Sequence, residues 1–437
     1  MNGNPRGHIR TLRGVSRMAI DAVTGLTDLV QALHSRIARS PSRLGGPLVD
    51  GAVNGITALV YDSVRGVTRA VGGGLDAALA QLGPLLAGLS DEAPAGSKAT
   101  EPARSREAVL AALNGVLGDY LAQTANPLAI PMALRRDGVP LVLTREALLS
   151  AIEAPRGRLV VLVHGLCMND LQWERGGAMV PVHDHGAALA RDLDATKLYL
   201  HYNSGLHVST NGQAFAAKME ALVAAWPAAI EELIIVGHSM GGLVARSAFH
   251  YGTEAGHAWP SRLRALVFLG TPHHGAPLER GGHWIDLLLH ATPYTAPFAR
   301  LGRVRSAGIT DLRHGSVLDE DWKGRDRFAH GRRAQADPRH PLPLPEQVNC
   351  YAIAATTAGA GADEKPMGGA AAGIGARAAR LPGDGLVPVA SALGWHADAR
   401  FALAFAPSHQ WIAWDSGHLD LLSSTAVYSR IRGWLER

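Results

Sequence analysis

The segment at residues 237–242 reads Gly-His-Ser-Met-Gly-Gly and places one serine, Ser239, between glycines two residues away on each side. An apolar, strand-like run comes directly before it (233–236), and a helix-like run begins directly after it. A Gly-x-Ser-x-Gly sequence between a strand and a helix holds the serine on a sharp turn, where its hydroxyl can act as a nucleophile. The first N–H groups of the helix are free to donate, and the helix dipole favours a developing anion there. We therefore expect Ser239 to be a nucleophile, the alternative being an inert serine in a Gly-rich turn.

A second apolar run, residues 159–163, ends in the tripeptide His-Gly-Leu. In a doubly wound sheet, functional groups gather at the carboxyl ends of the strands, so the backbone after this run can approach Ser239. The amide of Leu166 would then join the amide of Met240 in an oxyanion hole for a tetrahedral intermediate. Losing one such donor typically costs about 2.7–4 kcal/mol of activation barrier.

Two side chains beside that tripeptide could be mistaken for catalytic groups. We expect His164 to brace the loop, because a base must approach Ser239 from the side opposite the oxyanion hole. We expect Cys167 to be a small packed side chain and not a second nucleophile. Cys167 and Cys350 are the two cysteines of the chain and cannot form a disulfide framework, so we expect two buried thiols.

A serine hydroxyl needs a base to accept its proton, and the base needs an orienting partner. The chain has 20 histidines, so composition alone cannot choose among them. His418 lies just beyond the strand-like run 410–414, in a loop that precedes a final helix at about 424–435. This strand-end position favours His418 as the base. His409 precedes the same strand, at its wrong end, and is the main rival.

The acid that orients the base is assigned in the same way. Asp384 lies between two glycines on the long loop after the strand that contains Cys350, and those glycines allow the carboxylate to bend back toward an imidazole. Asp415, in the loop of the base itself, and Asp363, in a Gly/Ala-rich run, are the alternatives. With Asp384, the chain order is serine, acid, histidine, which is associated with one fold in particular.

Short apolar strands alternate with helices through most of the chain, which indicates a parallel sheet covered on both faces. A helix is expected at about 105–123, followed by a β-hairpin of residues 128–134 and 139–143 with Asp-Gly in its turn. The remaining strand-like runs are 159–163, 198–202, 233–236, 266–269, 348–355 and 410–414, and clear helix-like stretches cover 213–225 and 240–249.

From about residue 125 to the end, the sequence resembles the α/β-hydrolases of the esterase and lipase type. The resemblance rests on Gly-His-Ser-Met-Gly-Gly, His-Gly-Leu, and Gly-Asp-Gly-Leu-Val-Pro at 383–388. The segment Gly-Thr-Pro-His-His-Gly-Ala-Pro (270–277) is similar to one in bacterial lipases and in GPI inositol-deacylase-like hydrolases. The resemblance implies an α/β fold with a doubly wound, mostly parallel sheet and a serine hydrolase that cleaves carboxylic esters. It assigns the nucleophile, acid, base and two oxyanion amides to Ser239, Asp384, His418, Leu166 and Met240.

Two long connections interrupt this pattern, at 276–347 and 358–383. In the family that the sequence resembles, the segment 276–347 would be a cap or lid. Its apolar stretch at 284–298 suits a cover over an acyl pocket. An extra helix buried against the core is an equal alternative. Adjacent His273 and His274 could suggest a metal, but side chains on such a turn diverge and no acidic residue completes a ligand set. We expect neither a metal nor a cofactor.

The first 90 residues carry arginine and aspartate but neither lysine nor glutamate, and their apolar residues recur at steps of three and four. This spacing predicts an amphipathic helical region at 1–90, joined by a linker at 91–103 to a hydrolase domain at 104–437. The helices could form a hairpin packed on the main body. Alternatively, the region could bind a membrane or lipid surface, which would make the chain a lipid- or granule-associated protein.

Composition limits the remaining function classes. A hydrophobic fraction of 47% argues against disorder, and a net charge of +4 is too small to argue for a nucleic-acid partner. Neither a signal-peptide pattern nor a run of about 18 apolar residues is visible, so we expect a cytoplasmic protein, at most peripheral to membranes or lipid bodies. The expected partner is a small-molecule or lipid ester. A thioester, an amide or a storage polyester uses the same chemistry, and neither acyl length nor oligomeric state can be read from the residues.

Overall fold

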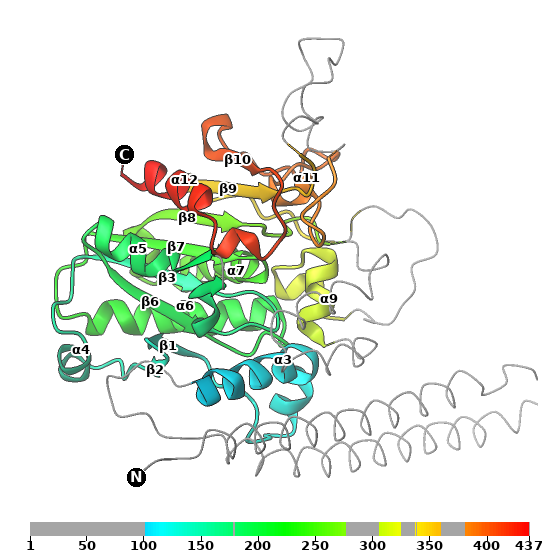
Figure 1. Cartoon of the computed structure of the whole chain (residues 1–437). Helices are drawn as coiled ribbons and strands as arrows, with labels where there is room; N and C mark the ends of the chain where they lie inside the picture. Colours follow the sequence, from blue (N-terminus) through cyan, green and yellow to red (C-terminus); the bar gives the residue numbers. More distant parts are fainter. Residues whose placement is uncertain are drawn as a thin grey trace, which may run out of the picture.

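The computed structural model describes the main body of the chain, namely residues 101–177, 180–276, 306–324, 337, 339–359 and 381–436. The predicted helical region at 1–90 and the apolar stretch at 284–298 lie outside the described residues, as does Asp363. Figure 1 traces the chain from α3 at one end of a central sheet to β10 and α12 at the other.

The central sheet has eight strands among the described residues, in the order β10-β9-β8-β7-β3-β6-β1-β2. The six strands from β10 to β6 run parallel, whereas β1 is antiparallel to both of its neighbours. In chain order they are β1 (Ala133–Arg136), β2 (Val139–Pro140), β3 (Arg158–Val163), β6 (Thr196–His201), β7 (Glu232–His238), β8 (Leu263–Leu269), β9 (Asn349–Ala355) and β10 (Gln410–Ala413). A separate ribbon pairs β4 (Arg175–Gly177) with β5 (Val180–His183).

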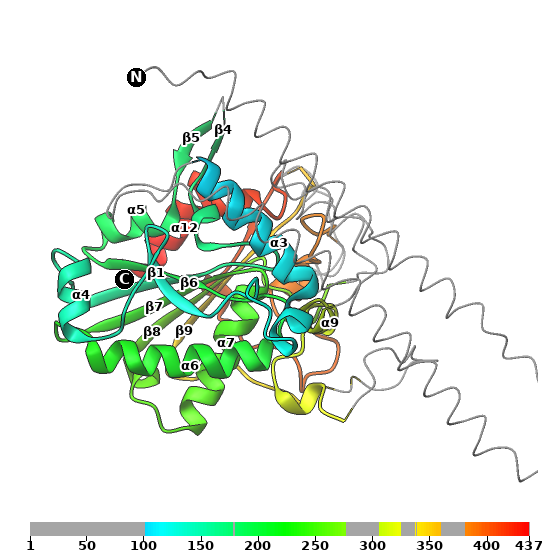
Figure 2. The same cartoon turned by 90° about the horizontal axis from the view of Figure 1, so that it is seen from below.

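Helices cover both faces of the sheet, as Figure 2 shows with α6 and α7 on one side and α5 and α12 on the other. Along β3, Val161 and Val163 face the first core, whereas Val160 and Leu162 face the second. Strands buried on both faces in this way read as continuous apolar runs. The helices are α3 (Glu101–Gln123), α4 (Arg145–Ala151), α5 (His185–Asp192), α6 (Val208–Ala225), α7 (Met240–Glu254), α9 (Ala307–His314), α11 (Val389–Ala392) and α12 (Thr425–Leu435). Short 3-10 turns are η1 (Asp170–Trp173), η2 (Trp259–Arg262), η5 (Asp319–Asp321), η7 (Pro407–His409) and η8 (Asp420–Leu422).

The predicted parallel sheet and its flanking helices are confirmed, and the expected strands all form within a few residues of their predicted ends. The predicted β-hairpin also forms, but its first strand, β1, starts and ends later in the chain than the predicted run 128–134. Asp137 and Gly138 have φ angles of 51° and 83°, so they alone make the turn. Two left-handed residues form the tight two-residue connection of a hairpin, and β1 therefore continues to Arg136.

The described part of the predicted insertion packs on the main body. Within α9, Ala307, Ile309 and Leu312 are buried. Ser306 Oγ donates to the backbone oxygen of Gly115 in α3 at 2.7 Å. The alternatives of a lid or a packed helix concern the stretch 284–298, which lies outside the described residues, so both stay predictions.

The first described helix, α3, begins at Glu101, inside the predicted linker. In the portion of the chain that the structure describes, no helix combines the length and the apolar character that crossing a membrane requires.

Candidate active site

Ser239 lies on a sharp turn between β7 and α7, with φ 54° and ψ −124°. Its backbone N–H donates to the oxygen of Leu269 at 2.8 Å, which ties the turn to the neighbouring strand β8. The turn is tight because its glycines touch backbone: a Cβ at Gly237 would lie 2.6 Å from the Gly242 nitrogen, and one at Gly241 would overlap the Val163 oxygen. A side chain at either position would therefore open the turn.

His418 and Asp384 form a buried pair. His418 Nδ1 lies 2.6 Å from Asp384 Oδ2, and both side chains are fully enclosed. The second carboxylate oxygen accepts the backbone N–H groups of Leu386 at 2.9 Å and Val387 at 2.7 Å. The His418 N–H also donates to the Asp384 backbone oxygen at 3.1 Å. The backbone contact ties the two loops together, and the side-chain contact through Nδ1 leaves Nε2 as the free ring nitrogen.

The imidazole of His418 and the Ser239 turn contact two consecutive residues, Gly270 and Leu269 respectively. A Cβ built at Gly270 would lie 3.1 Å from His418 Nδ1 and Cε1. Gly270 directly follows Leu269, whose oxygen holds the Ser239 backbone. His418 Nε2 is buried and has no hydrogen-bond partner among the described residues. Catalytic hydrogen bonds are often long in a ligand-free site, so a free Nε2 beside the serine turn is compatible with a base.

The rival residues lie elsewhere. Asp415 has its carboxylate beside Gly359, and no contact joins it to His418 in the described part of the chain. His409 precedes β10, where its Nδ1 lies 3.2 Å from the Cys350 oxygen and its ring packs on Tyr351. Parallel strands bring their carboxyl ends to one edge of the sheet. His409 is therefore at the opposite edge from Ser239.

The two expected oxyanion amides lie next to the serine. Met240 is the first residue of α7, and Leu166 follows Gly165, where an added Cβ would be 3.1 Å from Ser239 Cβ. Among the described residues, neither backbone N–H has a recorded acceptor. The next residue, Cys167, has φ 58° and donates its N–H to Ser204 Oγ at 3.0 Å, which holds the bend.

His164 and Cys167 are buried beside this bend. His164 stacks on Tyr202 with ring centroids 4.4 Å apart, and its Nδ1 lies 2.9 Å from the Gly165 oxygen. Burial lowers the pKa of His164 to about 3 and raises the pKa of the Cys167 thiol to about 12. A neutral imidazole and a protonated thiol at neutral pH suit packing, because a reactive cysteine needs its thiolate form.

Residues 154–337 match a family model described as "PGAP1-like alpha/beta domain". The matched segment contains β3, β6, β7, β8 and Ser239, and with β9 and β10 these strands form the parallel sheet. Over these residues the chain is similar to that family, and its mostly parallel sheet with helices on both faces is an α/β fold. The matched segment ends before Asp384 and His418, so their placement comes from the structure of this chain alone.

Solved structures that are similar to this chain include lipases and an esterase. The mature lipase BlEst2 of Bacillus licheniformis is 16% identical, with 70% of this chain and 98% of that chain covered and a TM-score of 0.37. A hormone-sensitive lipase from a metagenome library is 16% identical, with 64% of this chain and 77% of that chain covered and a TM-score of 0.35. The naproxen esterase of Bacillus subtilis is 12% identical, with 65% of this chain and 84% of that chain covered and a TM-score of 0.32. No curated protein matches the chain by sequence.

Two histidines that the sequence patterns do not single out contact the loop of His418. His238 Nε2 lies 3.1 Å from the His418 oxygen, and His185 Nε2 lies 2.8 Å from the Leu421 oxygen. The position of His238 next to the serine was the only available signal. Nothing in the sequence marks His185, which is 236 residues from Leu421.

His273 and His274 follow β8, and their rings have different neighbours. His273 Nδ1 lies 3.3 Å from the guanidinium of Arg246, and His274 Nδ1 lies 3.4 Å from that of Arg339. Burial lowers the pKa of both imidazoles. No group of three or more potential metal ligands occurs within the described ranges.

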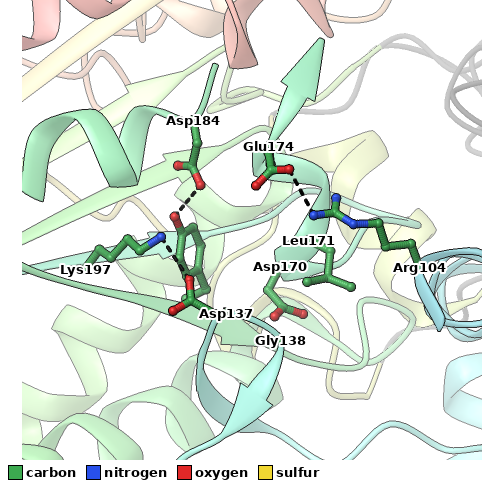
Figure 3. A pocket seen from close by; sticks show the side chains of 9 residues that line it. Arg104, Asp137, Gly138, Asp170, Leu171, Glu174, Asp184 and Lys197 are labelled. Atoms are coloured by element: carbon green, nitrogen blue, oxygen red, sulfur yellow. Dashed lines mark hydrogen bonds and ion pairs between the residues drawn. The ribbon is translucent and has the colours of Figure 1, made fainter. Parts of the chain in front are cut away.

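A polar pocket lies apart from these residues, between α3, the β1–β2 turn, η1 and β6 (Figure 3). Its charged groups pair with one another: Arg104 with Glu174 at 3.0 Å and Lys197 with Asp137 at 3.0 Å. Each of these two cations is therefore neutralised by a carboxylate. The pair of Lys197 and Asp137 also holds the β1–β2 turn against β6. Its lining consists of Arg104, Asp137, Gly138, Asp170, Leu171, Glu174, Asp184, Lys197 and Tyr199.

Proposed function

We propose that this α/β protein is a serine carboxylic-ester hydrolase of the esterase or lipase type. In this mechanism, Ser239 Oγ attacks the ester carbonyl while His418 Nε2 takes the hydroxyl proton. His418 then delivers that proton to the leaving alcohol, and an acyl-enzyme on Ser239 remains. Water attacks the acyl carbon, its proton passes through His418 back to Ser239 Oγ, and the carboxylic acid leaves.

The observation that carries this proposal is the juxtaposition at Leu269 and Gly270. The backbone of Ser239, with its positive φ, contacts Leu269, and the imidazole of the buried His418–Asp384 pair borders the next residue, Gly270. The Asp384 carboxylate accepts from His418 Nδ1, so Nε2 is the nitrogen available to the serine proton. Asp384 would also stabilise the imidazolium that forms when the proton arrives.

The backbone N–H groups of Leu166 and Met240 are the proposed oxyanion hole. Both belong to rigid main chain: Met240 opens α7, and Leu166 lies in a bend held by Ser204. Donors fixed before the reaction need no reorganisation when negative charge develops on the carbonyl oxygen, which is why such donors accelerate acyl transfer. The positive end of the α7 dipole acts in the same direction.

The proposed substrates are esters with an uncharged acyl group. Leu166, Met168, Met240 and Leu421 are buried around the serine turn and offer no counter-ion to a charged acyl chain. Thioesters, amides and polyesters share the acyl-enzyme step, and a panel of these substrates would separate them. The expected order has short uncharged esters ahead of amides, because an amine is a poorer leaving group than an alcohol.

The direct test is labelling with a fluorophosphonate, followed by mapping of the modified peptide by mass spectrometry. We expect the adduct on Ser239 and hydrolysis of p-nitrophenyl acetate by the wild-type chain. The Ser239→Ala variant should lose both while its thermal unfolding midpoint stays close to wild type. Ser261→Ala is a matched control, since Ser261 is exposed and precedes β8, at the edge of the sheet opposite Ser239. An adduct on another residue, or hydrolysis retained by Ser239→Ala, would refute the proposal.

A further inference from the structure

His238 is the last residue of β7 and immediately precedes Ser239. Its side chain is completely buried, and its Nε2 lies 3.1 Å from the backbone oxygen of His418. The two imidazole rings are 4.6 Å apart at their centroids. His238 thus belongs to the strand that leads into Ser239 and also contacts the main chain of His418.

The contact determines where the proton of His238 resides. A backbone carbonyl can only accept, so Nε2 must carry the hydrogen and Nδ1 must be bare. Nδ1 has no hydrogen-bond partner among the described residues and faces the bend after β3: a Cβ at Gly165 would lie 3.2 Å from it. Burial, reinforced by the nearby His418, lowers the pKa of His238 well below its ordinary value. His238 is therefore a neutral donor in one fixed tautomer.

The backbone of His418 is held from two sides. Its N–H donates to the Asp384 oxygen at 3.1 Å, and its carbonyl accepts from His238 at 3.1 Å. The first contact ties the base to the loop of the acid. Among the described residues, the contact with His238 ties it to β7, the strand that directly precedes Ser239.

A second imidazole anchors the same loop three residues later. His185, the first residue of α5, is completely buried, and its Nε2 lies 2.8 Å from the Leu421 oxygen. Its Nδ1 lies 2.8 Å from His183 Nε2. Because His185 must donate to the carbonyl through Nε2, His183 must donate to its Nδ1. The indole of Trp173 lies edge-on to the rings of both His185 and His238.

We propose that His238 is a positioning residue, which sets the distance between His418 and Ser239 by donating Nε2–H to the backbone of the base, with His185 as a second anchor of that loop. This inference rests on the proposed serine-hydrolase function. Without the contact, the base loop would keep its link to Asp384 but lose its link to the serine strand. A misplacement of the base by about 1 Å can reduce turnover about a hundredfold.

The test compares three substitutions that differ in where they place a donor. His238→Gln carries an amide nitrogen as far from Cβ as Nε2 is, whereas the amide nitrogen of His238→Asn reaches only the position of Nδ1. His238→Leu fills similar space without a donor. We expect the Gln variant to keep kcat for p-nitrophenyl acetate within about threefold, and the Asn and Leu variants to lose about ten- to a hundredfold. KM should change little in all three, because His238 does not border the substrate.

Two outcomes would overturn this role for His238. One is equal kcat in the Gln, Asn and Leu variants. The other is a rise in KM with kcat unchanged, which would indicate a contact with substrate. Ser239→Ala, assayed in parallel, separates failure of this inference from failure of the proposed function: only the latter leaves the Ser239→Ala chain active.

A measurement on the unmutated chain tests the same role without relying on the folding of a variant. Long-range ¹H–¹⁵N spectra of the imidazoles should show His238 and His185 as neutral rings protonated on Nε2. His238 is assigned from the signal lost in His238→Gln, and His185 from the signal lost in His185→Gln. A ring of His238 protonated on Nδ1 would refute the donor role whatever the activities of the variants.

Discussion

Replacing Asp384 by asparagine tests the orientation of the base. Asp384 Oδ1 accepts from the backbone N–H groups of Leu386 and Val387 at 2.9 and 2.7 Å, and Oδ2 faces His418 Nδ1 at 2.6 Å. An asparagine keeps the two backbone contacts through its carbonyl oxygen. Its NH₂ group must then face His418. Two donors cannot bond each other, so the imidazole would place its proton on Nε2 and accept at Nδ1.

A proton on Nε2 removes the lone pair that the Ser239 proton requires. We expect kcat for p-nitrophenyl acetate to fall about 10⁴-fold, as is typical when this tautomer is reversed. At about 1.36 kcal/mol per tenfold, this corresponds to about 5.4 kcal/mol of activation free energy. The fold should survive, since the two backbone contacts remain and the side chain keeps its shape.

The assay is steady-state hydrolysis with the thermal unfolding midpoint as a folding check. Asp415→Asn is the matched control, because Asp415 is the acidic residue of the same loop and has no recorded contact with His418 among the described residues. It should retain activity within about twofold of wild type, as is usual for a surface group away from the reacting atoms. A folded Asp384→Asn variant with less than tenfold loss, or a larger loss in Asp415→Asn, would refute this reasoning.

Three further predictions concern the base, stability and the insertion. His409→Ala should leave ester hydrolysis near wild type while His418→Ala abolishes it, as measured by kcat/KM, and the reverse result would move the base to the other end of β10. His164 has a pKa lowered to about 3 by burial, so the unfolded chain takes up a proton below about pH 6.5 that the folded chain does not. The free energy of unfolding should therefore fall as pH decreases from 6.5 toward 3, by up to about 1.4 kcal/mol per pH unit for this group, and denaturant titrations of His164→Asn should show a shallower pH dependence. Asp311→Ala should lower stability by about 1–3 kcal/mol in urea unfolding, since the buried carboxylate receives the backbone N–H of Val208 at 2.8 Å and faces His207 Nδ1; an unchanged midpoint would show that α9 is not anchored there.

Much of this arrangement can be predicted from local patterns. The strand before Ser239 and the helix after it are continuous in sequence, so the turn between them follows from periodicity and glycine alone. The pairing of Asp384 with His418 follows from their positions after parallel strands, because such loops meet at one edge of the sheet. Both features depend on strand order and on nothing about side-chain packing.

The parts that escaped prediction depend on packing between distant elements. His185 contacts Leu421 through a single carbonyl across 236 residues, and no residue type or spacing marks a backbone acceptor. The extent of β1 was misjudged because Arg135 and Arg136 read as turn residues, whereas their long side chains suit a strand near the sheet edge. Arg135 reaches Glu107 at 2.8 Å in α3, a partner known only from the folded chain.

The division of the site along the chain has a consequence for biosynthesis. His238, beside the serine, and His418 are 180 residues apart. At about 5–20 residues per second, translation needs roughly ten to forty seconds to cover that distance. A nascent chain would thus display its nucleophile well before its proton acceptor leaves the ribosome, and β10, at the sheet's outer edge, would be among the last strands to dock. On the proposed mechanism, a chain that stops before residue 418 lacks the proton acceptor and has no hydrolytic activity, although its serine turn has already been made.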